Sequence, residues 1–116
     1  MENERFSQAI SLYSKVIGTV SDEEAKAYLL LARGKLYYLT ERYDQAKLDF
    51  EKIADIKKTD IQTEAQFFLV TTLYYLGEEE KARSLANNYI IVNPNHRRTP
   101  DVILWIAKND FNNGLY

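Results

Sequence analysis

The chain has 116 residues, of which 46% are hydrophobic and 28% charged, and its formal net charge is −2. Four glycines and two prolines are too few for the many tight turns of an all-β fold, and the absence of cysteine excludes disulfides, thiolate catalysis and cysteine-based zinc sites. The slightly acidic balance gives no support to binding of nucleic acid through its phosphates. No apolar run is long enough to cross a membrane.

The spacing of apolar residues predicts six helices. In chain order they are residues 3–18, 22–40, 43–56, 60–76, 79–92 and 100–112. Three of them start at capping signals, which are Ser21 with Glu24, Thr59 in a Thr-x-x-Gln pattern, and Thr99 before Pro100. The connections are short, so successive helices are expected to pack antiparallel. No alternation of period two predicts a strand.

A repeat organises these helices. Ala9, Ala46 and Ala82 occupy similar contexts at spacings of 37 and 36 residues. Because alanine lets two helices approach at the short end of the usual spacing of about 8–10 Å, all three are expected to be buried at hairpin crossings. One hairpin cannot cover its own apolar face, so neighbouring hairpins must stack.

The residues around Ala46 form a pattern, which in order is Leu30, Arg33-Gly34, Tyr37, Tyr43, Ala46 and Phe50. This order and spacing resembles the tetratricopeptide repeat family. A weaker second unit comprises Leu69, Leu73, Gly77, Ala82 and Pro94, with Val70 and Ala86 in place of the small and the aromatic residue of the pattern. Two flanking segments resemble half-repeats: a second helix with Phe6, Ala9 and Tyr13, and a first helix with Ile103, Ala107 and Gly114.

The resemblance implies an all-α fold, in which antiparallel helix-turn-helix repeats stack in a right-handed superhelix, an α-solenoid. It covers residues 1–116 as one helical-repeat domain, which we interpret as part of a longer array. In this family the first helices of successive hairpins line a concave groove that takes peptides.

By the repeat register, the expected groove residues are Tyr28, Leu31, Lys35, Tyr38, Glu64, Phe67, Thr71, Tyr74, Tyr75, Asp101, Leu104, Lys108 and Phe111. The alternative is that several of these rings belong to the core, because aromatic stripes at helical spacing often do. Some members of the family grip a terminal carboxylate with a Lys and an Asn one turn apart on a first helix. No such pair is present here.

Signals of catalysis or metal binding are sparse. His96 is the only histidine, and without an oriented partner or further ligands we interpret it as a solvated loop residue. Arg97 and Arg98 form the only basic cluster, interpreted as a solvated turn, with a site for a phosphate or an acidic partner as the alternative. The chain is therefore not expected to be an enzyme, and no cofactor or metal is expected.

The leading hypothesis for function is a scaffold or adaptor that binds a peptide or protein segment in its groove. One alternative is a regulatory or self-assembly module of a larger protein, such as an enzyme or an envelope-assembly protein. Residues 102–107 are apolar almost all round, so homo-oligomers through the terminal helices are also expected. Helical-repeat RNA binding is a further alternative, which the acidic balance disfavours. The compartment is not specified: the cytoplasm is favoured, with the periplasm the alternative had a signal been removed.

Overall fold

The computed structural model describes residues 2–54 and 59–112, and all of its regular structure is helical. The helices are α1 (Glu2–Ile17), α2 (Glu23–Leu39), α3 (Tyr43–Ile53), α4 (Thr59–Tyr75), α5 (Glu79–Val92) and α6 (Thr99–Asn112). The six predicted helices are thus confirmed, with boundaries shifted by at most one residue, except that α3 ends three residues early, at Ile53. The prediction for the third helix extends to residue 56, which lies outside the described residues.

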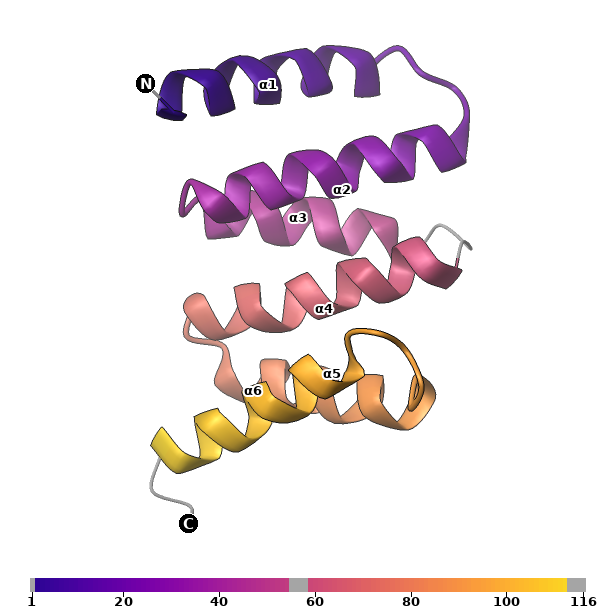
Figure 1. Cartoon of the computed structure of the whole chain (residues 1–116). Helices are drawn as coiled ribbons and strands as arrows, with labels where there is room; N and C mark the ends of the chain where they lie inside the picture. Colours follow the sequence, from indigo (N-terminus) through magenta and orange to yellow (C-terminus); the bar gives the residue numbers. More distant parts are fainter. Residues whose placement is uncertain (1, 55–58, 113–116) are drawn as a thin grey trace.

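Consecutive helices pack against each other, and α2 also contacts α4. Figure 1 shows the resulting stack, with α2, α4 and α6 on the near side and α3 and α5 behind them. The stack is elongated, with extents of 48 × 33 × 20 Å. This is the architecture of a helical-repeat solenoid, and its right-handed twist stays a prediction.

The helix starts differ in detail from the predicted caps. Asp22, not Ser21, caps α2, because its carboxylate accepts a hydrogen bond of 2.9 Å from the amide of Ala25. The Gln62 amide reaches back to the carbonyl of Ala54 at 2.8 Å instead of to the start of its own helix. Thr99 is buried at the start of α6, and its hydroxyl donates to the carbonyl of Asn93. Each of these side chains ties a helix start to nearby backbone.

The core has two parts. The larger joins α2, α3 and the start of α4, and its buried residues are Ala27, Leu30, Leu31, Ala46, Phe50, Ile53, Ile61 and Ala65. The smaller joins α4, α5 and α6 through Val70, Ala86, Tyr89 and Val102. Each hairpin therefore buries its apolar face only by stacking on the next.

The small residues at the hairpin crossings behave as expected in the two complete hairpins. Ala46 and Ala82 are completely buried, and Gly34 is buried against the ring of Phe50. Ala9 is only partly buried, so that expectation is wrong. The reason is that α1 packs on α2, and no described helix covers its opposite face.

An ion pair inside the first hairpin joins three helices. Arg33 donates to both oxygens of Asp49, at 2.8 Å from Nε and 2.6 Å from Nη2. It also donates to the hydroxyl of Ser14 on α1 at 3.0 Å. These hydrogen bonds outweigh burial and raise the pKa of Arg33. Since Asp49 is buried, this bidentate contact satisfies a charge that would be costly to leave unpaired.

Candidate functional site

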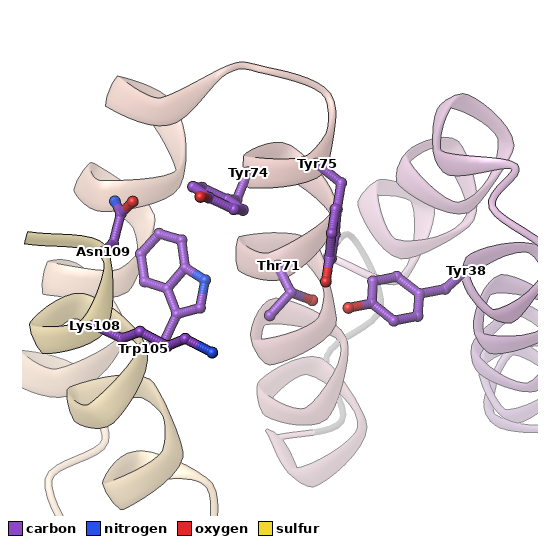
Figure 2. Close-up of a pocket in the computed structure, with 7 residues that line it drawn as sticks. All are labelled: Tyr38, Thr71, Tyr74, Tyr75, Trp105, Lys108 and Asn109. Atoms are coloured by element: carbon purple, nitrogen blue, oxygen red, sulfur yellow. The ribbon is translucent and has the colours of Figure 1, made fainter. Parts of the chain in front are cut away.

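A small cleft of about 120 Å³ opens where the first helices of successive hairpins converge. Its lining comes from α2, α4 and α6, and consists of Tyr38, Thr71, Tyr74, Tyr75, Trp105, Lys108 and Asn109. Figure 2 shows these side chains converging on the space between the helices. The cleft thus lies on the helices that the repeat register assigned to the groove.

Aromatic rings form a continuous chain along the cleft. The rings of Tyr74 and Trp105 meet edge to face, with centroids 5.6 Å apart, and thereby join α4 to α6. Tyr74 is followed by Tyr75 at 5.9 Å, and Tyr75 by Tyr38 at the same distance, which joins α4 to α2. Tyr75 also stacks flat on Tyr43 of α3, at 4.9 Å. Such ring pairs hold one another in place, so the wall of the cleft is preorganised.

Polar groups are placed among these rings. Figure 2 shows the hydroxyls of Tyr38, Thr71 and Tyr75 directed toward one another. Burial is the main cause that raises the pKa of Tyr38, and its hydrogen bond with Thr71 opposes the rise. A neutral tyrosine hydroxyl at such a place can donate to, or accept from, a bound polar group.

Lys108 supplies the charge of the cleft. It is exposed, and Figure 2 shows its ammonium group directed toward α4. Within the described residues it makes no ion pair. The cleft therefore combines apolar ring faces with one cation that forms no ion pair with the described residues.

The structure brings together five of the thirteen expected groove residues, namely Tyr38, Thr71, Tyr74, Tyr75 and Lys108. Tyr28 and Leu104 are exposed but do not line the cleft. The Lys35 ammonium lies over the ring of Phe68, 5.0 Å from its centroid. The side chain of Phe111 lies outside those that the structure describes.

Two of the proposed residues are unavailable to a ligand. Leu31 is buried in the larger core, because the first helix of a hairpin turns this position toward its neighbours. Phe67 packs against the smaller core and lies under the guanidinium of Arg98, 4.8 Å from the ring centroid. The alternative that some of the aromatic stripe is core is therefore correct for Phe67, while Tyr75 is exposed.

Sequence reasoning missed two residues of the cleft, Trp105 and Asn109. By register, Trp105 of α6 is equivalent to Ala32 and Phe68, each of which directly follows an expected groove position. One signal could have found it: Trp105 is the only tryptophan of the chain, and it lies one helical turn before Lys108, an expected groove residue. Asn109 is buried, but it stands between Lys108 and Asp110 in the sequence, so nothing in the local pattern indicated its burial.

A second polar cluster joins the turn before α6 to the start of α4. Arg98 donates to both carboxylate oxygens of Glu64, with a shortest contact of 2.8 Å, and Arg97 adds a contact of 3.2 Å. Burial acts most strongly on the pKa of Glu64 and raises it, but the hydrogen bonds and charges of the arginines outweigh it and hold that pKa below its usual value. Glu64 is thus a buried structural carboxylate and not an inward-facing binding residue.

The interpretation of residues 96–98 as a solvated turn holds for Arg97, which is exposed, and is wrong for His96 and Arg98, which are half-buried. Nδ1 of His96 lies 2.7 Å from the hydroxyl of Tyr89 and accepts from the amide of Arg98 at 3.2 Å, while Nε2 lies 3.3 Å from Asp60. The cations of the turn face carboxylates of α4 across one complete repeat, so the cluster is largely neutralised by its own chain. Asp101, another expected groove residue, lies 3.8 Å from Arg98.

In the part of the chain that the structure describes, no group of three or more histidine, aspartate or glutamate side chains is placed to hold a metal ion. No described helix is long and apolar enough to cross a membrane.

Comparison with known proteins finds distant relatives. Protein unc-45 homolog B of Xenopus laevis is 28% identical over 104 residues, which make up 90% of this chain and 11% of that protein. Its namesake in Xenopus tropicalis is 28% identical over 96 residues, which make up 83% and 10%. No protein-family model and no solved structure matches. The chain spans about a tenth of the length of these relatives. The all-helical stack is that of a helical-repeat protein.

Proposed function

We propose that the chain is an interaction module that binds a segment of another protein in the cleft between α2, α4 and α6. The observation that carries the proposal is the convergence of four aromatic rings and one ammonium group, which forms no ion pair with the described residues, from the helices α2, α4 and α6 on one accessible space. Rigid aromatic side chains provide contact area at low entropic cost, and they are enriched where proteins bind one another. The proposal gives the chain a binding role and no catalytic one.

The chemistry of the cleft defines the ligand class. The ring faces of Tyr74, Tyr75 and Trp105 suit apolar or aromatic side chains, and the ammonium of Lys108 suits a carboxylate beside them. A segment with an acidic residue next to one or two large apolar residues fits both. Burying two or three such side chains at about 1.5–3 kcal/mol each only partly offsets the cost of ordering a peptide, so we expect affinities of about micromolar strength.

A library of peptides displayed on phage, selected on the immobilised chain, tests this proposal without a known partner. We expect enriched peptides to combine acidic and aromatic residues and to change the emission of Trp105, the only tryptophan. Their affinities should then be measured by calorimetry against two cleft variants, Tyr75→Ala and Lys108→Glu. Each is expected to weaken binding about tenfold or more, through lost ring contact and through charge reversal.

The chain offers a matched control for each variant. Tyr28 is 56% exposed, as Tyr75 is, and lies on α2 outside the cleft, so Tyr28→Ala removes an equal ring from the wrong place. Lys52→Glu reverses an exposed charge on α3. Peptides that bind the cleft variants as tightly as the parent, or that lose affinity equally for the controls, would refute the cleft as the binding site. Melting curves verify that each variant is folded.

A further inference from the structure

Each end of the stack has a helix with one face that no described helix covers. α1 packs on α2, and α6 packs on α5 (Figure 1). By the repeat register α1 is equivalent to α3 and α5, the second helices of complete hairpins. α6 is equivalent to α2 and α4, the first helices. The uncovered face of α1 is therefore the one that would meet a first helix, and that of α6 the one that would meet a second helix.

The uncovered face of α1 exposes positions that complete hairpins bury. Asp49 and Ile53 of α3 are almost entirely buried against α2. The equivalent residues 37 positions earlier are Leu12 and Val16. Leu12 is 62% exposed and Val16 is also exposed. An exposed leucine at a position that carries a paired, buried aspartate in α3 is apolar surface without a partner.

The uncovered face of α6 has the complementary deficit. Leu30 and Leu31 of α2 are buried in the larger core. The residue 73 positions after Leu30 is Ile103, which is 50% exposed. The uncovered face of α1 thus lacks a first helix, which α6 of another copy would supply. The uncovered face of α6 lacks a second helix, which α1 of another copy would supply.

The sizes of the side chains match across these two faces. In the first hairpin Gly34 meets the ring of Phe50 so closely that a Cβ on Gly34 would lie 2.6 Å from it. In the second hairpin the equivalent positions carry Val70 and Ala86, both buried in the smaller core. Each hairpin therefore sets a smaller residue against a larger one. The uncovered faces repeat this rule, because α6 carries Ala107 and α1 carries Tyr13 at these positions.

The positions that directly precede these in each helix match in polarity. In the first hairpin they hold the ion pair of Arg33 and Asp49. In the second they are Leu69 and Leu85, and the equivalent residues of α6 and α1 are Ile106, which is half-buried beside the smaller core, and Leu12. Charge faces charge in one hairpin and apolar side chain faces apolar side chain in the other. At this position the face of α6 would therefore meet an apolar side chain of α1, and neither face carries a charge there.

We propose that copies of this chain associate head to tail, with α6 of one copy packing antiparallel on α1 of the next to complete a hairpin. The contact joins two different faces, so every addition leaves one free α1 face and one free α6 face, and the assembly can continue. This association goes beyond the proposed peptide binding and uses other residues. Leu12 and Ile103 lie outside the cleft, so failure of one proposal does not decide the other.

Sedimentation velocity of the whole chain at increasing concentration tests the proposal. We expect the average mass to rise with concentration and to exceed that of a dimer at high micromolar concentrations. Leu12→Asp disables the α1 face and Ile103→Asp the α6 face, so each variant alone should sediment as a monomer. Mixed in equal amounts they should form a heterodimer that grows no further, because the remaining two faces both carry aspartate. Leu48→Asp, at an exposed position of α3, should behave as the parent.

Three results would overturn the head-to-tail arrangement. The first is a parent chain that stays monomeric at high micromolar concentration. The second is a mixture of the two variants that forms no heterodimer, and the third is a single variant that still dimerises, because contacts between like faces behave in these ways. Melting curves establish that the variants fold, and Leu12→Gln with Ile103→Gln replaces any aspartate variant that does not.

Discussion

Replacing Gly34 by alanine tests whether the close approach of α2 and α3 constrains the fold. The added Cβ would lie 2.6 Å from Cε1 of Phe50 and 3.0 Å from its Cδ1. Phe50 is buried, and its ring stacks on that of Phe68 with centroids 5.8 Å apart. The ring therefore has no exposed side toward which it could swing, and the two helices or the ring must shift.

Two opposing effects decide the sign. Alanine in the middle of a helix is favoured over glycine by about 0.5–1 kcal/mol, whereas overpacking a well-filled core costs about 1–3 kcal/mol. The clash wins, and Gly34→Ala should lower the free energy of unfolding by about 1–2 kcal/mol. Phe50→Leu removes the ring atoms that Cβ would meet. In that background Gly34→Ala should become stabilising by up to about 1 kcal/mol, since only the helix preference remains.

The assay is urea unfolding of the parent, both single variants and the double variant, followed by circular dichroism. The reversal of sign between the two backgrounds is the decisive observation, because general damage to the helix would lower stability in both. If Gly34→Ala stabilises the parent, or costs the same with Leu at position 50, the close contact with Phe50 is not what selects glycine there.

Two further substitutions test local features. Gly77 has a φ of +82° at the end of α4, and no atom lies near the place that a Cβ would take. Gly77→Ala should therefore cost about 1 kcal/mol from backbone strain alone, and Gly77→Asn should cost less. Thermal melts measure both effects, and equal melting temperatures would contradict this. Glu64→Gln removes the charge that Arg98 and Arg97 bind and should cost about 2–3 kcal/mol. Since the folded-state pKa of Glu64 is lowered, its contribution is fully present above the ordinary pKa of a glutamate and is lost as pH falls from there through the lowered folded-state pKa. The difference in stability between parent and Glu64→Gln should therefore shrink in acid-unfolding experiments below about pH 4.

The fold could be predicted because its determinants are local and repeated. Ala46 and Ala82 mark the crossings, and the apolar spacing of each helix follows from its own residues. The prediction failed for Ala9 because the burial of a crossing residue depends on a partner helix as well as on its own sequence pattern. The cap of α2 was predicted one residue too early, at Ser21 instead of Asp22. Both residues can cap a helix, and only the backbone conformation decides which of them does.

The candidate site was predicted only in part, because the register assumes that every first helix presents the same positions to the groove. α2 and α4 approach each other more closely than α4 and α6, and at the wider gap the indole of Trp105 reaches the ring of Tyr74. A change in helix spacing of this kind has no signature within one repeat. The ion pair of Glu64 and Arg98 was missed for the same reason, since it joins residues 34 positions apart through the path of a turn.

The wider gap and the ion pair are connected, and this gives Glu64→Gln a second consequence. Arg98 immediately precedes α6, so its hydrogen bonds to Glu64 fix the start of α6 against α4. Toward the other end, the only ring contact that joins α4 to α6 among the described residues is that of Tyr74 with Trp105. Trp105 and Lys108 therefore lie about two to three helical turns from a contact that holds the start of α6 on α4. Loosening that contact at neutral pH should shift the emission of Trp105 in the folded protein and weaken peptides selected on the cleft, while Gly77→Ala, which destabilises without touching α6, should leave both unchanged. Equal effects of the two variants on Trp105 would show that the cleft responds to overall stability and not to this ion pair.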